Sequence, residues 1–254
     1  MLYGLYLSAS GLRAQDGRQS ITANNLANAQ TVGFKRDYSI IAARANACYE
    51  DPAMAGYCHP VLKDQGGGVT MASSGIDLTQ AALDKTGRPF DVAVDGEGFL
   101  QVQGENAQQT LLTRDGRLAI NNQGVLVQAS SGKAMLDVNG QTLKVSPNDP
   151  LEINGHGEVK QYGTVVGQLA LTAVQSPGDL QKVGNGLMAL RAGAETQPAE
   201  GSKLRQGFTE SSGVDPVVEM VNMLEGQRIY EANAKMIQYQ DQTLGQLNTV
   251  GRIA

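Results

Sequence analysis

The sequence predicts a mainly β protein with terminal α-helices: an antiparallel all-β central domain flanked by N- and C-terminal helices that pair as a coiled coil. Apolar residues recur with a helical period at both ends of the chain, and short alternating segments separated by Gly- and Asn-containing turns fill the middle. The expected organisation is a terminal helical domain of residues 1–36 and 209–254, an extended loop-rich segment of residues 37–75, and an antiparallel β-domain of residues 76–208.

The first helix is expected over residues 1 to about 32. Its apolar residues recur at alternating steps of three and four, the pattern of a heptad seam; they are Leu2, Leu5, Ala9, Leu12, Ala23 and Leu26. Gly33 follows where a helix commonly ends on a residue with positive φ. Asn24, Asn25 and Asn28 lower the helix propensity near this end. They either terminate and cap the helix or fix the register between subunits, as a buried Asn does in coiled coils.

The segment after the first helix contains two prolines, the run Gly66–Gly68 and the only two cysteines, which predicts loops. Cys48, Cys58 and His59 could offer three soft ligands, but their spacing matches no standard zinc pattern. The sequence therefore predicts no metal site here, and a loop in which Cys48 and Cys58 either stay free or pair as a disulfide.

Short strands are expected over most of residues 76–208. Residues 90–94 alternate between apolar and polar, a turn follows at residues 95–98, and an apolar run resumes at Phe99. Asn139–Gly140 and Asn154–Gly155 are hairpin signals, because both central residues of such a turn must accept positive φ. Further strands are predicted at Leu111–Thr113, Leu118–Ile120, Val125–Gln128 and Leu143–Val145.

A second long helix is expected at the C-terminal end. Asp215 can cap it, with Pro216 in the first helical position, where the missing N–H costs nothing. Apolar residues recur every seven positions behind this start; they are Met223, Tyr230, Ile237 and Leu244. Met220, Leu224, Ala234 and Leu247 widen the same stripe.

Composition excludes several functional classes. The net charge of −5 over 254 residues argues against a nucleic-acid partner, which calls for a concentrated basic surface. No window approaches the ~18 apolar residues of a membrane span, so no membrane insertion is expected. The N-terminus lacks the basic region of a cleaved signal peptide. No nucleophile elbow, P-loop or dinucleotide motif occurs, so we expect no enzyme, no catalytic residue, no cofactor and no metal.

Each terminal helix must bury its apolar stripe against a partner. Ordering about 30 residues costs roughly 1–2 kcal/mol each, more than eight buried aliphatic side chains return at about 1.5–3 kcal/mol apiece. Two explanations remain. The ends pack as a coiled-coil hairpin beside the β-domain, or they stay largely unfolded in the monomer and order only among neighbouring subunits.

Three motifs, spread in order over nearly the whole chain, resemble those of bacterial flagellar basal-body rod and hook proteins. The first is residues 23–28 with Thr31 and Gly33–Arg36. The second is residues 88–99 with Thr113–Gly116. The third is Ser212–Pro216 followed by residues 219–223, Gln227–Arg228 and Tyr230–Glu231.

The resemblance implies a structural subunit of the rod, the axial drive shaft that transmits torque from motor to hook, exported by the flagellar type III apparatus without a cleaved signal. Its implied partners are further copies of itself in a helical homopolymer, other rod and hook proteins and the export apparatus. Its implied place is the flagellar basal body, spanning the periplasm. The length favours a rod protein over a hook protein, and the distal rod is slightly favoured over the proximal rod. The resemblance also favours folding on assembly.

The residues expected at subunit interfaces come from both helices and the first motif; they are Leu5, Leu12, Asn24, Asn25, Leu26, Asn28, Gly33, Phe34, Asp215, Met220, Met223, Tyr230, Ile237, Leu244 and Leu247. Two functions outside the flagellum remain as alternatives. A secreted β-rich binding or phage-tail-like module with coiled-coil ends would have folded, oligomeric ends. A hydrolase on a β-scaffold would gather His156 or His59 with a carboxylate in a pocket.

Overall fold

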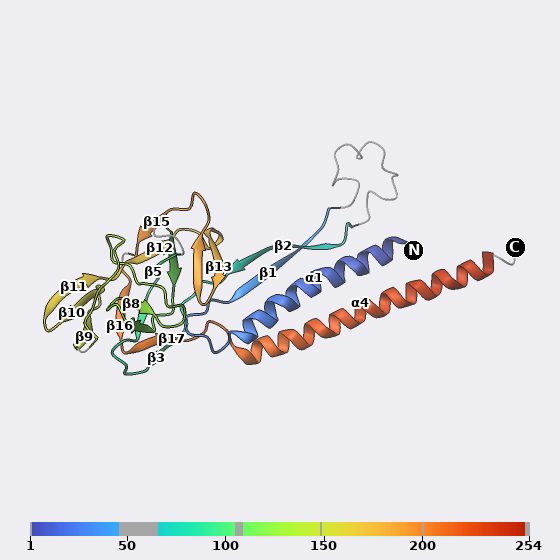
Figure 1. Ribbon diagram of the computed structural model, residues 1–254. Coiled ribbons are helices and arrows are strands. Elements are labelled where there is room, and N and C mark those ends of the chain that lie inside the picture. Colours follow the sequence, from blue (N-terminus) through green and yellow to red (C-terminus); the bar gives the residue numbers. More distant parts are fainter. Residues whose placement is uncertain (1, 46–65, 105–108, 148, 200, 252–254) are drawn as a thin grey trace. The chain divides into compact units, whose positions relative to one another are not determined.

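The computed structural model describes residues 2–45, 66–104, 109–147, 149–199 and 201–251 (Figure 1). It is mainly β, with one helix at each end and antiparallel sheets, as the sequence predicts. The chain divides into two compact units. The helical unit comprises residues 1–27, 37–75 and 216–254, and the β-unit comprises residues 28–36 and 76–215.

The helical unit contains α1 (Leu2–Ala27), α4 (Pro216–Gly251) and a two-stranded sheet of β1 (Asp37–Ala43) and β2 (Val69–Ile76). Helix α1 packs against α4 and against β1. Where the sequence predicts a loop-rich segment, the structure thus has a strand at each end. Cys48 and Cys58, for which the sequence leaves free thiols and a disulfide both open, lie with His59 outside the described residues.

Helix α1 ends at Ala27, about five residues before the predicted end. In the last turn of α1, the Asn25 side chain bonds both backbone groups of Asp37 at the start of β1. Its Nδ2 donates to the Asp37 carbonyl (2.8 Å), and the Asp37 N–H donates to its Oδ1 (3.0 Å). Residues 28–33 then form turns, and Gly33 has the predicted positive φ, +67°.

The β-unit is built from short strands in several small sheets. A six-stranded sheet has the order β13-β14-β6-β5-β12-β15, a three-stranded sheet has the order β11-β10-β9, and β16-β4, β17-β3 and β7-β8 form pairs. The bounds are β3 (Leu83–Lys85), β4 (Val92–Asp95), β5 (Phe99–Gln103), β6 (Thr110–Thr113), β7 (Leu118–Ile120), β8 (Leu126–Gln128), β9 (Leu151–Ile153), β10 (Glu158–Gln161), β11 (Thr164–Gln168), β12 (Leu171–Val174), a 3₁₀ turn (Pro177–Asp179), β13 (Leu180–Gly184), β14 (Leu187–Leu190), β15 (Thr196–Pro198), β16 (Lys203–Gln206) and β17 (Phe208–Glu210).

The core of the β-unit is aliphatic, as the scarcity of aromatic residues leads one to expect. Fully buried side chains from several sheets meet in one cluster; they include Val92, Val94, Leu100, Leu126 and Val159. The predicted strands near residues 111, 118 and 126 are present, whereas residues 143–145 form only an isolated bridge, between Lys144 and Val125.

The turns depart from the prediction at both expected Asn–Gly pairs, because φ is positive at Gly140 (+75°) but not at Asn139, and not at Asn154. The hairpin with positive φ at an Asn–Gly pair is Asn185 (+53°) with Gly186 (+71°), between β13 and β14. At Asn154, φ is not positive; instead its Oδ1 accepts hydrogen bonds from the N–H groups of His156 and Glu158, both at 3.0 Å. An Asx side chain can close a turn in this way without a left-handed backbone.

Candidate assembly surface

Where α1 and α4 meet, glycines of one helix face amide side chains of the other at three positions. A Cβ at Gly4 would lie 2.8 Å from the side-chain nitrogen of Gln240, and one at Gly11 would lie 3.3 Å from the side-chain amide of Asn233. Gly226 of α4 faces the Gln15 amide of α1 in the same manner. Contacts run down α4 as they run up α1, so the helices are antiparallel. The buried side chains of α1 are small or polar, so this helix buries little apolar area; they are Ser8, Ala14, Gln15, Thr22 and Asn25.

Large apolar side chains of α4 are instead exposed to solvent. The exposed residues are Val217, Val218, Met220, Val221, Leu224, Ile229, Tyr230, Met236, Tyr239 and Leu247. Val221 and Leu224 are both 59% exposed, and at a spacing of three they share one face of the helix. Exposed apolar side chains that gather on one face of a helix are typical of an interaction site.

The predicted interface residues occupy three kinds of position. Half-buried positions are Leu5, Leu12, Leu26, Met223, Ile237 and Leu244, whereas Met220, Tyr230, Leu247, Asn24 and Asp215 are exposed. Asn25, Gly33 and Phe34 are buried, and Asn28 is half-buried. Helix α4 begins at Pro216, directly after Asp215, as predicted.

The residues that follow α1 belong to the β-unit. Gly33 lies so close to Arg114 that a Cβ on it would be 2.5 Å from the Arg114 carbonyl carbon. The Lys182 ammonium lies 3.9 Å from the centroid of the Phe34 ring, in a cation–π contact. The same ammonium donates a hydrogen bond to the Lys35 carbonyl at 2.6 Å. This segment is therefore part of the packed β-unit.

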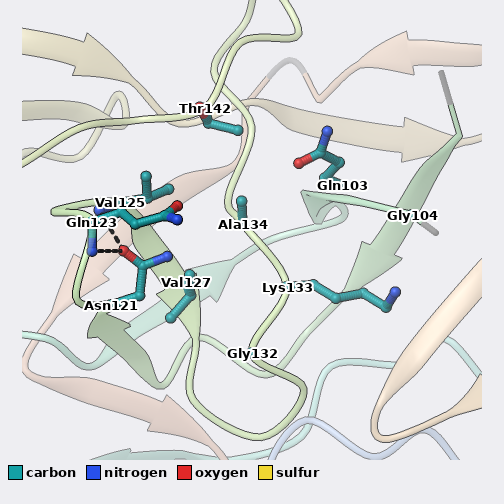
Figure 2. Close-up of a pocket in the computed structure, with 10 residues that line it drawn as sticks. All are labelled: Gln103, Gly104, Asn121, Gln123, Val125, Val127, Gly132, Lys133, Ala134 and Thr142. Carbon is teal, nitrogen blue, oxygen red and sulfur yellow. Dashed lines mark hydrogen bonds between the residues drawn. The ribbon is translucent and has the colours of Figure 1, made fainter. Parts of the chain in front are cut away.

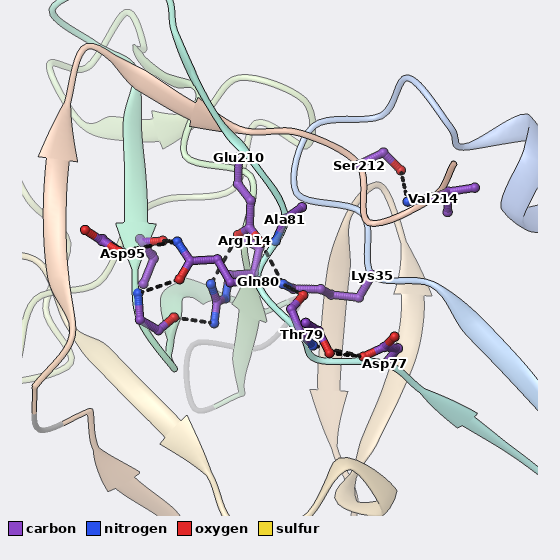
Figure 3. Close-up of polar contacts among 12 residues, drawn as sticks. Lys35, Asp77, Thr79, Gln80, Ala81, Asp95, Arg114, Glu210, Ser212 and Val214 are labelled. Carbon is purple, nitrogen blue, oxygen red and sulfur yellow. Dashed lines mark hydrogen bonds and ion pairs between the residues drawn. The ribbon is translucent and has the colours of Figure 1, made fainter. Parts of the chain in front are cut away.

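A buried charge cluster that the sequence did not predict includes Lys35 of this segment (Figure 3). Glu210, at the end of β17, accepts from Lys35 Nζ at 2.7 Å and from Arg114 Nη1 at 3.1 Å. All three side chains are at most 2% exposed. Lys35 Nζ also donates to the Thr79 carbonyl, and the Ala81 N–H donates to Glu210 Oε1. Lys35 and Arg114 belong to the motifs that carry the resemblance; the sequence holds no local sign that Glu210 joins them.

The cluster holds two cations and one carboxylate. Burial lowers the pKa of the Lys35 ammonium from its usual 10.5, and the Arg114 guanidinium lowers this pKa further, while Glu210 raises it. Burial also lowers the pKa of Arg114, opposed by Glu210. The Arg114 guanidinium additionally donates to the Gly96 carbonyl and lies 4.9 Å from the centre of the Phe99 ring. The cluster is thus fully dependent on Glu210 for a bonded counter-charge.

A pocket of about 510 Å³ opens on the β-unit (Figure 2). Its polar lining includes Gln103, Lys133 and Thr142. Asn121 also lines it, and the Asn121 Oδ1 accepts hydrogen bonds from the N–H groups of Gln123 and Val125. Neither His156 nor a carboxylate lines it. The lining therefore lacks the His and the carboxylate that the hydrolase alternative requires, so that alternative gains no support from this pocket.

The described residues also bear on the expected absence of a metal site and of a membrane-spanning helix. Among the described residues, no group of three or more His, Cys, Asp or Glu side chains could hold a metal ion. None of the helices, over the part of the chain that is described, is long and apolar enough to cross a membrane.

Three stretches of the chain match family models. Residues 5–35 match "Flagella basal body rod protein", residues 93–165 match "Flagellar hook protein FlgE/F/G D1 domain", and residues 205–250 match "Flagellar basal body rod FlgEFG protein C-terminal". The three matches follow the order of the three motifs. They also span both helices and part of the β-unit.

Curated relatives agree over nearly the whole length. The flagellar basal-body rod protein FlgF of Caulobacter vibrioides is 32% identical over 234 residues, which cover 92% of this chain and 91% of the relative. The rod protein FlgG of Bacillus subtilis is 30% identical over 271 residues (99% and 100%), and FlgG of Buchnera aphidicola from Acyrthosiphon pisum is 31% identical over 267 residues (98% and 99%). These relatives are structural proteins and not enzymes, which sets the hydrolase alternative aside. With this identity over more than nine-tenths of both sequences, the chain belongs to the family of flagellar basal-body rod proteins.

Proposed function

We propose that this protein is a structural subunit of the flagellar rod, which polymerises helically and transmits torque from motor to hook. The observation that carries the proposal is the exposed apolar surface of α4. Burying one Val or Leu against a neighbouring subunit contributes about 1.5–3 kcal/mol. A repeated contact between different surfaces of identical subunits builds an open helical filament rather than a closed ring.

We further propose that α1 and α4 form an antiparallel coiled coil that becomes ordered on assembly. The heptad spacing of Gly4 and Gly11 against Gln240 and Asn233 supports the pairing. The same seam, being small and polar, gives an isolated subunit little hydrophobic stabilisation for these helices. Neighbouring subunits would supply the missing contacts to the exposed residues of α4.

Within the rod, the distal segment is the position we propose. The FlgG relatives of Bacillus and Buchnera align with this chain from end to end, and FlgG is the distal rod protein. The proximal segment is the second candidate, because the FlgF relative of Caulobacter is 32% identical to this chain. Fluorescently labelled protein in strains arrested before or after distal rod assembly separates the two. Incorporation only in the later arrest supports the distal position.

The remaining parts of the proposal follow from membership of the rod. The partners are further copies of this chain, adjacent rod and hook proteins and the flagellar export apparatus, with no nucleic acid. The place is the basal body where the rod spans the periplasm, reached without a cleaved signal peptide. Intact N-terminal residues on protein recovered from purified basal bodies would support export without cleavage, and a shortened N-terminus would refute it.

The decisive experiment compares two equally exposed valines. Val221 on α4 and Val183 on β13 are both 59% exposed, so an aspartate at either position should leave the subunit folded. In a strain lacking the natural gene copy, Val221→Asp should abolish swimming and the recovery of rods, whereas Val183→Asp should not. Normal rods with Val221→Asp would refute assembly through this face of α4.

Ordering on assembly has its own test in the purified monomer. Limited proteolysis at low concentration should remove residues of α1 and α4 rapidly and leave the β-unit, as fragment masses would show. Protected helices in a dilute monomer would refute ordering on assembly and favour the alternative of a self-contained module with coiled-coil ends.

A further inference from the structure

The chain leaves α1 and returns to α4 at one place in the β-unit. Asn28, the first residue after α1, accepts a hydrogen bond on its carbonyl from Ser212 Oγ at 2.9 Å, across 184 residues of sequence. The Gly33 N–H donates to the Glu210 carbonyl at 2.8 Å, and the Gly213 N–H donates to the Phe34 carbonyl at 2.8 Å. The two connecting segments are therefore bonded to each other within the β-unit.

We propose that these segments form a junction latch: Asn28, Gly33, Lys35, Arg114, Glu210 and Ser212 stay folded with the β-unit in the unassembled subunit and hold the end of α1 beside the start of α4. The first motif of the family is thereby divided. Its residues up to Ala27 belong to the helix, whereas Gly33–Arg36 serve the β-unit.

Charge makes the latch specific. Glu210 is the residue through which Lys35 and Arg114 are joined, at 2.7 Å and 3.1 Å, and all three are excluded from solvent. Asp77 adds a more distant negative charge facing Lys35, and Glu97 does so for Arg114. A buried cation without a bonded counter-charge is strongly destabilising, so this arrangement forms only when residues 28–36 and the segment that contains Glu210 are both in place within the β-unit.

The latch has a consequence for how the helices pair. Closing a loop of this length in a flexible chain carries a large entropic cost. Folding of the β-unit already includes this loss of entropy, because it brings Asn28 and Ser212 into a hydrogen bond before either helix needs to be ordered. The two helices then meet as segments on a short tether, at a high effective concentration.

Amide hydrogen exchange of the full-length monomer, read residue by residue by NMR, tests the latch. Four N–H groups report on it: Gly33 and Gly213, together with Asp77, which donates to the Arg36 carbonyl, and Ala81, which donates to Glu210 Oε1. They should exchange as slowly as the paired amides of β5 and β6. Fast exchange at Gly33 and Gly213 in the natural sequence, at the rate found in α1, would overturn the proposal.

Variants sharpen the test. Glu210→Gln should accelerate exchange at the four reporter amides by about 100-fold or more, because it leaves two buried cations without their carboxylate. The control Glu152→Gln, an exposed carboxylate on β9, should leave them unchanged. Equal rates in the two variants would refute the role of Glu210.

If Glu210→Gln fails to fold, Ser212→Ala keeps the test open. It removes the hydrogen bond to Asn28 and the longer one that Ser212 Oγ accepts from the Val214 N–H (3.3 Å), and no charge. It should accelerate exchange at Gly33 and Gly213 by about 2- to 10-fold, with the β5–β6 amides unaffected. No change at either glycine would overturn the tie between the two segments. The latch is read in the monomer, so its failure would leave the rod assignment intact, whereas slow exchange in α1 would count against ordering on assembly and not against the latch.

Discussion

Removing the single anion of the buried cluster should cost far more stability than removing one of its cations. Glu210→Gln leaves Lys35 and Arg114 buried side by side with no bonded carboxylate. Lys35→Met instead leaves Arg114 and Glu210 as a balanced pair and fills a similar volume. The two substitutions alter the same contact, at 2.7 Å, yet one leaves two buried cations without a bonded carboxylate and the other leaves a neutral ion pair.

The magnitudes follow from the burial of the cluster. Stranding buried charge by removing one partner typically costs about 3–5 kcal/mol, and Glu210→Gln falls in that range because both cations are at most 2% exposed. Lys35→Met loses the hydrogen bonds of the ammonium to the Thr79 carbonyl and to Glu210, each worth about 1.5–3 kcal/mol, but also relieves the burial of an ammonium beside a guanidinium. Its net cost should stay below that of Glu210→Gln, because it leaves no buried cation without a bonded carboxylate.

Urea unfolding of the purified protein, followed by circular dichroism in the β-sheet region, measures both free energies of unfolding. The exposed control Glu152→Gln should change that free energy by no more than about 0.5 kcal/mol. Equal losses for Glu210→Gln and Lys35→Met, or a larger loss for Lys35→Met, would refute the reasoning from charge balance.

Three further outcomes are expected. Ile237→Pro should abolish swimming, because proline interrupts a helix at a cost of about 3 kcal/mol, while the free energy of unfolding of the β-unit stays unchanged; swimming cells would contradict it. Gly33→Ala should destabilise the β-unit by more than Gly87→Ala, which has a similar φ (+70° against +67°) but open space in place of the Arg114 backbone; equal urea midpoints would contradict this. As the pH rises from neutral toward 10.5, the unfolding free energy of the natural protein should increase relative to Lys35→Met, because the lowered pKa of folded Lys35 leaves the unfolded chain binding more protons in that window; a flat or falling difference would contradict it.

Local patterns predicted the elements well where the physical cause is local. Asp215–Pro216 marks the start of α4, because a capping side chain and a residue without an N–H suit the first helical turn. Gly33 has the predicted positive φ, but it does not end the helix as predicted, because α1 ends at Ala27 and turns separate the two. The end of α1 was misplaced by about five residues, and the hydrogen bonds of Asn25 to Asp37, a residue beyond the helix, could not be predicted from the periodicity.

Long-range contacts, by contrast, could not be read from period or motif. The stripe of Leu5 and Leu12 suggested the helix face that would be buried, yet the contact with α4 involves Gly4 and Gly11, one position away and so about 100° around the helix. Apolar periodicity identifies a face that needs a partner. It does not say whether that partner is the same chain or a neighbouring subunit.

The sequence by itself determined a β-domain between two terminal helices, the start of the second helix and the family, because periodicity, turn residues and motifs are written along the chain. Only the tertiary structure decided that Lys35, Arg114 and Glu210 share one buried site and that residues 28–36 belong with the β-unit. The physical reason is that a buried charge is satisfied by whichever opposite charge the fold brings within about 3 Å, and that choice depends on contacts between residues far apart in sequence.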